Sequence, residues 1–188
     1  MSRIHNLSQV KNMKASLLVF ACCLLFVYVL RTCIFAVTSI PSESMCDTMQ
    51  VGDKLFAINT YFLDDLHRGD IIVFEPNEEE KDKGQGLWTK RVVGLPGDKI
   101  RIENGIVYVN GTKQKEEYVK HPASYTGSFT VPNGKYFCCG DNRANSWDAR
   151  FWSNPFLTRD QIKYKMLFRI LPFNRMGNIY KEKSIAVE

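Results

Sequence analysis

A run of uncharged, mostly apolar residues near the amino terminus constrains this chain more than any other feature. Ala15 to Leu30 is sixteen residues without a charge, Arg31 interrupts the run, and residues 32–40 are again uncharged. A helix that spans a membrane needs about 20 apolar residues. Arg31 is compatible with a span, because its aliphatic stem can lie in the apolar layer while its guanidinium reaches the headgroups. We therefore expect a transmembrane anchor over residues 15–38.

The distribution of charge orients this anchor. The net charge is +5, and residues 1–31 contribute +4 of it, since they hold four bases and no acid. Basic residues are enriched on the cytoplasmic side of a span. Residues 1–14 are predicted to form a cytoplasmic basic tail, and residues 39–188 an extracytoplasmic domain on a single-pass protein of the cell membrane. Because the excess charge is confined to the tail, no nucleic-acid partner is expected.

Two other interpretations of the apolar run were weighed. A cleaved secretory signal peptide needs small residues after its apolar core, and Ile34 and Phe35 are bulky at that place. A buried helix of a soluble domain is disfavoured by the one-sided basic flank. The uncleaved anchor is therefore the prediction.

Beyond residue 40 the pattern changes to short strands separated by turns. Asn110-Gly111 predicts a tight hairpin turn, and the charged stretch Glu78–Lys83 predicts a solvated loop. The fold class is therefore mainly β, an antiparallel, barrel-like domain behind one N-terminal helix. In chain order, the expected strands are Lys54–Asn59, Ile71–Phe74, Trp88–Val93, Lys99–Glu103, Ile106–Val109, Thr112–Val119, Tyr136–Cys139 and Tyr164–Leu171.

The six cysteines predict neither a disulfide framework nor a metal site. Three of them lie in or beside the apolar run, and Cys138 and Cys139 are adjacent in a predicted strand. The sequence has no C-x-x-C pair and no Cys/His spacing of the kind that binds zinc. We expect no metal and no cofactor.

Two segments suggest hydrolytic chemistry. Ser44 lies between the apolar run and the first long strand, just after Pro41, which restricts the backbone. A serine hydroxyl needs a base, and Lys90 can be that base if burial between Trp88 and Val92 keeps its amine neutral. Taken alone, each residue has an ordinary alternative: a turn serine and a surface lysine with a buried stem.

A third segment, residues 140–150, mixes acids and arginines after a strand. Its charged side chains can pair and rigidify a loop, and Ser146 can hydrogen-bond a lysine amine. The three histidines lie in the tail or in charged, loop-like surroundings, so a Ser/His/Asp triad is poorly supported. The nearby aromatic residues are interpreted as core residues in preference to a patch on the bilayer; they are Trp147, Phe151, Trp152 and Phe156.

Taken together, these segments resemble those of the bacterial type I signal peptidases. The family's serine motif, P-S-x-S-M-x-P-T-L, is similar to Pro41–Met49, which reads P-S-E-S-M-C-D-T-M. Residues 52–54 and 68–74 resemble the next motif, and Lys90–Asp98 closely resembles the lysine motif. Gly140–Arg150 resembles the last motif, G-D-N-R-x-x-S-x-D-S-R. The motifs occur in the family's order over almost the whole chain.

The resemblance implies a membrane-bound serine endopeptidase that removes signal peptides from exported preproteins, and we expect it to be a monomer. By position, Ser44 matches the family's nucleophile and Lys90 its general base. Ser42 matches the residue that helps to hold the oxyanion, and Ser146 the residue that orients the lysine amine. The positions that match the substrate pocket are Ile40, Pro41 and Met45, and those that match structural ionic positions are Arg91, Asp141, Arg143, Asp148 and Arg150.

The chain departs from the family pattern at two places. Asp47 stands where the family usually has proline, and Ala149 where it has serine. A carboxylate facing Lys90 would raise the pKa of the lysine, so Asp47 is expected to point to solvent. The large inserted domain of some Gram-negative members is not evident, so the chain is similar to the compact Gram-positive form.

Three alternative functions stay open at this stage. A peptidase dedicated to one pilin or conjugation substrate would share every motif. A self-cleaving serine/lysine protein of the DNA-damage-repressor kind would be soluble, which the predicted anchor opposes. A membrane-anchored β domain that only binds partners would have no need of both Ser44 and Lys90.

Overall fold

The structure is a computed structural model that describes residues 2–46, 48–84 and 86–180, with side chains from residue 13 onward except at Thr32. Its internal contacts divide the chain into two units, Met1–Ala36 and Val37–Glu188. Asp47, which was predicted to point to solvent, lies outside the described residues.

The first unit is helical. Helix α1 spans Ser2–Val29, and a π-helical turn, Leu30–Ile34, leads to strand β1, Phe35–Ser39. The α-helix therefore ends well before residue 38, because the β-branched residues after Phe35 favour a strand. In the part of the chain that the structure describes, no helix combines the length and the apolarity that crossing a membrane requires.

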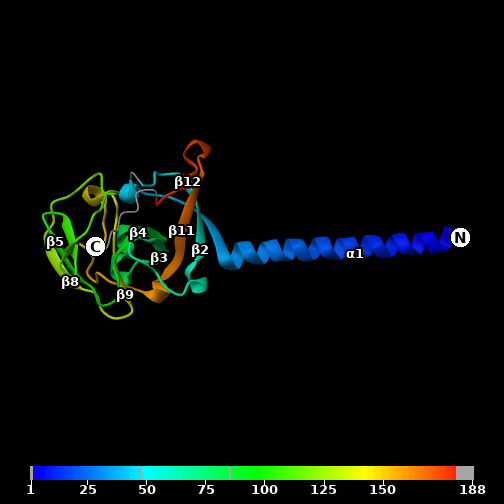
Figure 1. Ribbon diagram of the computed structural model, residues 1–188, viewed down its shortest axis with the longest axis horizontal. Coiled ribbons are helices and arrows are strands. Elements are labelled where there is room, and N and C mark those ends of the chain that lie inside the picture. Colours follow the sequence, from blue (N-terminus) through cyan, green and yellow to red (C-terminus); the bar gives the residue numbers. More distant parts are fainter. Residues whose placement is uncertain (1, 47, 85, 181–188) are drawn as a thin grey trace. The chain divides into compact units, whose positions relative to one another are not determined.

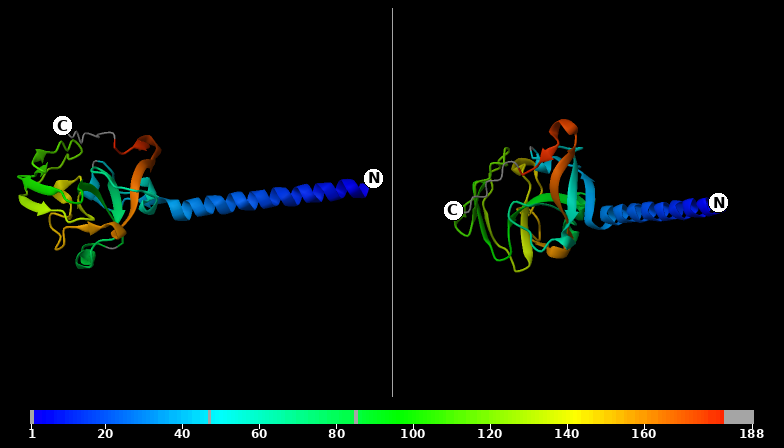
Figure 2. Two further views of the ribbon diagram at one scale, coloured as in Figure 1. Left: turned by 60° about the horizontal axis from the view of Figure 1, so that its bottom comes forward. Right: turned by 45° about the vertical axis from the view of Figure 1, so that its right-hand side comes forward.

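The second unit contains two antiparallel sheets (Figures 1 and 2). The larger has eight strands in the order β1-β2-β11-β3-β4-β9-β10, with β12 paired to β11, and the smaller has the order β7-β6-β5-β8. The mainly antiparallel β class is thus confirmed, although the described strands of the larger sheet form an open path. The strands of the larger sheet are β2 Lys54–Asn59, β3 Ile71–Phe74, β4 Trp88–Gly94, β9 Lys135–Cys139, β10 Leu157–Thr158, β11 Ile162–Leu171 and β12 Gly177–Asn178. Those of the smaller sheet are β5 Lys99–Glu103, β6 Ile106–Val109, β7 Thr112–Lys113 and β8 Gly127–Thr130.

Short 3₁₀ helices join several strands. They are η2 Glu43–Met45, η3 Thr60–Phe62, η4 Glu78–Lys83, η5 Arg143–Asn145, η6 Arg159–Gln161 and η7 Phe173–Arg175. Two of them, η2 and η5, carry residues of the predicted serine and last motifs.

Local patterning predicted most of the strands. The hairpin turn between β6 and β7 is confirmed, since Asn110 and Gly111 both have positive φ (51° and 86°), as a two-residue hairpin turn requires. Four strands had not been predicted: β8, β10 and β12, which are short, and β1, most of which lies within the predicted anchor.

Beyond residue 40, two predictions of secondary structure were wrong, and both for tertiary reasons. The strand expected over Thr112–Val119 stops at Lys113. The chain then turns away and carries Glu116 to Arg143 and Tyr118 to Arg91. The stretch Glu78–Lys83 is a 3₁₀ helix rather than a solvated loop, and its Glu80 is buried.

The buried hydrophobic residues form two clusters. One lies between the two sheets and includes Phe74, Val107 and Phe137. Trp152 belongs to this cluster and Phe156 packs against it, so their interpretation as core residues is confirmed. For Trp147 and Phe151 the interpretation was wrong, since each is 43% exposed. The second cluster lies under β2 and β11 and is the one that holds the serine motif; its members are Ile40, Met45, Met49, Leu55, Ala57, Ile71, Val73, Met166 and Ile179.

Candidate active site

The segment around Ser44 is fixed at both ends. Ile40 donates a backbone hydrogen bond to the Asp53 carbonyl (3.0 Å) and accepts one from Gly52 (2.9 Å). The side chains of Ile40 and Met45 are buried in the second hydrophobic cluster. Because both flanking side chains are anchored in the core, Ser44 is held in the short helix η2 rather than on a free turn.

The Asp53 side chain links this segment to residues near the carboxyl end of the domain. Its carboxylate is fully buried and pairs with Arg169 (2.9 Å) and Arg175 (2.5 Å), while also accepting a hydrogen bond from the Gln50 backbone. A buried carboxylate is tolerated only when it is paired and hydrogen-bonded. The turn that holds Ile40 is therefore tied to the end of β11.

Lys90 lies in the middle of the larger sheet. It is on β4, opposite Ile72 of β3, and the next residue pairs with Cys139 of β9. Lys90 is only 4% exposed, and Nζ donates a hydrogen bond to Ser146 Oγ (3.0 Å). Burial lowers the pKa of Lys90 from 10.5 to about 8, against the attraction of Asp148, which raises it. The amine is consequently neutral in about one tenth of molecules at pH 7, far more than for an ordinary lysine.

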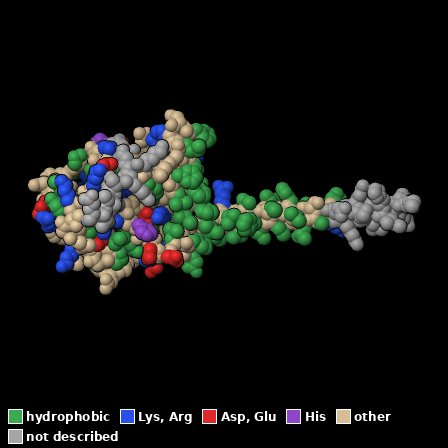
Figure 3. Space-filling view, in the orientation of Figure 1, with side chains coloured by type: hydrophobic (Ala, Val, Ile, Leu, Met, Phe, Trp, Pro, Cys, Tyr) green, Lys and Arg blue, Asp and Glu red, His purple; other side chains and the backbone are tan. Residues whose placement is uncertain are grey.

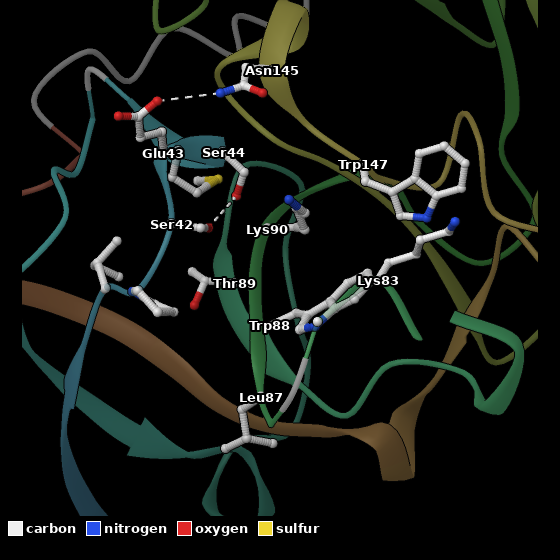
Figure 4. Close-up of a pocket in the computed structure, with 14 residues that line it drawn as sticks. Ser42, Glu43, Ser44, Lys83, Leu87, Trp88, Thr89, Lys90, Asn145 and Trp147 are labelled. Carbon is white, nitrogen blue, oxygen red and sulfur yellow. Dashed lines mark hydrogen bonds between the residues drawn. The ribbon is translucent and has the colours of Figure 1, made fainter. Parts of the chain in front are cut away.

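Ser44 and Lys90 share one cavity of about 390 Å³. Figure 4 shows the Ser44 hydroxyl and the Lys90 amine turned toward each other across it. Ser44 Oγ lies 3.2 Å from Ser42 Oγ, so the recorded hydrogen bonds of the two groups go to Ser42 and Ser146. In free enzymes catalytic hydrogen bonds are often long and tighten only with substrate. The arrangement places the Ser44 hydroxyl, the Lys90 amine and the Ser42 hydroxyl around one cavity.

The loop after β9 closes over the serine turn. Asn142 donates to the Ser44 carbonyl (3.1 Å) from its backbone and to the Glu43 carbonyl (3.1 Å) from its side chain. A Cβ at position 140 would overlap Ser146 Oγ and the Ser44 carbonyl, so this close approach requires Gly140. The serine turn and the Ser146 loop are therefore packed against each other.

Comparison with known proteins assigns the chain to a family. Residues 13–171 match the model of the family described as signal peptidase, peptidase S26. The chain belongs to this family. It is 38% identical over 151 residues to the probable signal peptidase I-2 of Synechocystis sp., covering 79% of this chain and 68% of that protein. It is 36% identical over 164 residues to the signal peptidase I of Bacillus caldolyticus, covering 79% of this chain and 86% of that protein.

A solved structure is also similar. A signal peptidase I from Enterococcus faecalis V583 is 26% identical, with a TM-score of 0.43 over 52% of this chain and 93% of that one. The predicted resemblance to bacterial type I signal peptidases is thus confirmed by the family match and the curated relatives. The compact Gram-positive form stays a prediction.

In this signal peptidase all five residues that match the family's ionic positions are buried. Arg91 and Asp141 form a two-pronged pair, with Nε–Oδ1 at 2.8 Å and Nη2–Oδ2 at 2.6 Å. Arg150 makes a similar pair with Asp148, which also accepts from the Gly140 backbone (2.9 Å). Burial alone would raise the pKa of Asp148, but the hydrogen bond and charge of Arg150 hold that pKa below its ordinary value.

Several supporting residues lie outside the motifs of signal peptidases. Glu116 pairs with Arg143 (2.6 Å), and the centroid of the Tyr118 ring lies 4.0 Å from the Arg91 guanidinium carbon. Glu80 accepts a hydrogen bond from Trp147, which lines the cavity. No sequence signal pointed to these residues, because each acts through a partner far away along the chain.

The two histidines whose side chains the structure describes, His67 and His121, are not part of the cavity. The side chain of His67 is 76% exposed, and His121 is also exposed. Neither lines the space around Ser44. The geometry therefore favours a lysine base over a histidine base.

Proposed function

We propose that this signal peptidase cleaves signal peptides from exported preproteins, with Ser44 as the nucleophile and Lys90 as the general base. The observation that carries the proposal is a buried amine, with a pKa lowered to about 8, facing a serine hydroxyl in an open cavity. Membership in the family supports the reaction class. The buried amine supports the assignment of the base.

In the proposed reaction the neutral Lys90 amine takes the Ser44 proton as Oγ attacks the carbonyl carbon of the scissile peptide bond. The Ser42 hydroxyl, 3.2 Å from Ser44 Oγ, donates to the oxyanion; one such donor is worth roughly 3 kcal/mol. The Lys90 ammonium then gives its proton to the leaving amine. A water molecule, deprotonated by Lys90 in turn, hydrolyses the acyl-enzyme.

Ser146 is proposed to orient the amine. It accepts a hydrogen bond from Lys90 Nζ, and Gly140 fixes its hydroxyl by close packing. An amine with one N–H bound to Ser146 keeps its lone pair available to the space where Ser44 lies. This role needs no charge change at Ser146.

The substrate side chain before the cut is proposed to lie beside Ile40, Pro41 and Met45, which line the cavity. Ile40 and Met45 are almost fully buried, so the walls they form cannot move outward without disturbing the core. Rigid walls exclude bulky side chains by steric overlap, which favours small residues at this position.

The pH dependence of cleavage tests the assignment of Lys90. Because only the neutral amine accepts the Ser44 proton, kcat/KM should rise as pH increases through about 8, the pKa of the buried lysine. Roughly one tenth of the enzyme is competent at pH 7 and roughly nine tenths at pH 9. The measurement uses a fluorogenic peptide with alanine before the cut, and circular dichroism as a control for folding. A flat profile from pH 6 to 9 would remove Lys90 from the proton path.

We also propose that the chain works at the cell membrane with its catalytic domain outside the cytoplasm. The uncharged run from residue 15 to residue 30 and its one-sided basic flank support attachment. Exposed hydrophobic side chains, among them Tyr61, Phe62 and Phe173, lie on the second unit, and Figure 3 shows hydrophobic side chains gathered over the region of β2 and β11. Large exposed apolar patches mark interaction surfaces. The monomeric state stays a prediction.

Alkaline carbonate extraction tests the attachment. The chain produced in a bacterial host should stay in the membrane pellet. Carbonate removes peripheral contacts, but it does not extract an apolar helix from the bilayer. Replacing Leu24 and Leu25 together with lysine should move the protein to the supernatant, since each central lysine costs about 3 kcal/mol of insertion free energy. Release of the unaltered chain by carbonate would contradict the proposal.

A further inference from the structure

A buried carboxylate outside the family motifs contacts the substrate cavity through a tryptophan. We propose that Glu80 is a positioning residue that holds Trp147 as a fixed wall of the cavity, and that the Glu80–Trp147 pair thereby limits the size of the side chains accepted at the scissile bond. The inference rests on the proposed function, since it assigns a determinant of specificity to the same site.

The first observation is the burial of Glu80. It is 2% exposed, whereas Glu78 and Glu79 on the same short helix η4 are exposed to solvent. Its two carboxylate oxygens accept separate hydrogen bonds, from the Trp147 indole N–H (2.6 Å) and from the Ser153 backbone N–H (2.8 Å). Burying a carboxylate is costly unless its oxygens are hydrogen-bonded. The carboxylate therefore ties η4 to both ends of residues 147–153.

The second observation is the place of Trp147. It directly follows Ser146, whose hydroxyl binds Lys90, and its side chain lines the cavity that holds Ser44. Figure 4 shows Trp147 and Lys83 on the opposite side of Lys90 from Ser42. The side of the cavity facing the serine segment is thus formed by an indole.

The third observation is that this indole is exposed yet fixed. Trp147 is 43% exposed. Its ring stacks on Phe151 at a centroid distance of 5.6 Å and an interplanar angle of 17°, and Lys83 Nζ lies 5.4 Å from its centroid. Glu80 holds the indole nitrogen. A half-exposed tryptophan with its rotation blocked in this way can act as a rigid boundary for a ligand.

These contacts set the width of the site. Ile40, Pro41, Lys83 and Trp147 all line the cavity. We infer that an extended peptide whose carbonyl carbon reaches Ser44 passes between the first two residues and the last two. A rigid pocket rejects one additional methylene group by about 10- to 200-fold. Without the Glu80 hydrogen bond, the indole could rotate outward and admit a larger side chain.

Paired peptides test the proposal. Alanine and leucine are compared at each of the two residues that adjoin the scissile bond, and kcat/KM is measured for the full-length chain and its variants. Trp147→Ala should raise kcat/KM for a leucine peptide by about 10-fold or more at one of these positions. Glu80→Gln should raise it by about 3- to 10-fold, because glutamine keeps only one acceptor oxygen for the two N–H groups that Glu80 binds, which weakens the hold on Trp147. Glu79→Gln, an exposed neighbour on η4, is the matched control and should change neither peptide.

A gain of activity on the bulky peptide is a result that simple destabilisation does not produce. In a Trp147→Phe background, which lacks the indole N–H, Glu80→Gln should add no further gain, because the two residues act through one hydrogen bond. Acrylamide quenching of Trp147 fluorescence, taken as the difference from Trp147→Phe, should increase in Glu80→Gln.

An unchanged alanine-to-leucine ratio in both Trp147→Ala and Glu80→Gln, or an equal loss on both peptides, would overturn the inference and leave the pair a purely structural contact. Cleavage of the alanine peptide by the unaltered enzyme reports on the proposed function separately. Unchanged quenching in Glu80→Gln would contradict the positioning role even without any cleavage data.

Discussion

Lys90→Met should abolish cleavage and at the same time make the protein more stable at pH 7. The loss of cleavage follows from removal of the proposed base, and general-base catalysis by one positioned group contributes about 10²- to 10⁴-fold. The gain in stability follows from the pKa of Lys90, which burial lowers from 10.5 to about 8. A buried amine at an active site is reactive because its pKa is lowered, and the same burial makes the folded protein less stable.

The sign of the stability effect can be worked out from linkage. Between about pH 8 and 10.5 the unfolded chain binds more protons at this lysine than the folded protein does, so the free energy of unfolding rises with pH in this window. Below pH 8 the folded protein carries the full cost of burying the protonated Lys90 amine, about 3 kcal/mol for a pKa shift of this size. Methionine has a similar shape and no charge to bury. Losing the hydrogen bond to Ser146 costs about 1 kcal/mol. The free energy of unfolding should therefore increase by a net of about 2 kcal/mol.

Thermal unfolding at pH 7 measures this gain. A stabilisation of about 2 kcal/mol corresponds to a Tm increase of roughly 4–8 °C for a chain of this size. Lys99→Met, at an exposed position on β5, is the matched control and should leave both Tm and cleavage unchanged. Lys90→Arg should also be inactive, since a guanidinium stays protonated. Cleavage by Lys90→Met at the original rate would contradict the role of Lys90 as the base. A lower Tm at pH 7 would contradict the claim that its buried amine destabilises the fold.

Local patterns predicted the parts of the fold in which each residue's environment is set by its neighbours in sequence. Strand β5 alternates exposed and buried residues as its sequence alternates polar and apolar ones. The apolar neighbours of Lys90 on β4 left two possibilities open, a buried amine or a surface lysine with a buried stem, and the structure shows the first, with Lys90 only 4% exposed. In contrast, Glu80 is 67 residues from its partner Trp147 and Glu116 is 27 residues from Arg143. Nothing in a charged local segment indicates which of its carboxylates will be buried by a distant partner.

The site was predicted as a set of residues but not as a geometry. The order of the motifs pointed to Ser42, Ser44, Lys90 and Ser146. In the structure the first three line one cavity, and Ser146 is hydrogen-bonded to Lys90. The reason for Gly140 was not apparent from the sequence. Only the fold reveals that its Cα packs against the Ser44 carbonyl and the Ser146 hydroxyl, where no side chain fits. Such close approaches between distant segments leave no local pattern.

Asp141→Ala should strongly destabilise the protein, because it removes one partner of a buried ion pair in the loop that follows β9. Asp141 is fully buried and binds Arg91 through two hydrogen bonds, and Thr48 donates to the same carboxylate (2.5 Å). Removing one partner of a buried ion pair costs about 3–5 kcal/mol, because the remaining charge is left buried without compensation. Here that charge is Arg91, whose other contacts are the Gly69 carbonyl (2.9 Å) and the ring of Tyr118.

Urea unfolding followed by circular dichroism should therefore show a midpoint lowered by about 1–5 M, given slopes of about 1–3 kcal/mol per M. Glu103→Ala, which removes one partner of an exposed pair with Arg101, is the control and should cost less than about 1 kcal/mol. The double variant Arg91→Met with Asp141→Leu should recover much of the lost stability, because neither charge is then buried. Equal costs for Asp141→Ala and Glu103→Ala would mean that burial does not set the energy of the Arg91 pair.

Because Asp141 adjoins Gly140, a loss of the pair also loosens the loop that packs on Ser44, so cleavage should fall even at urea concentrations where the variant remains folded.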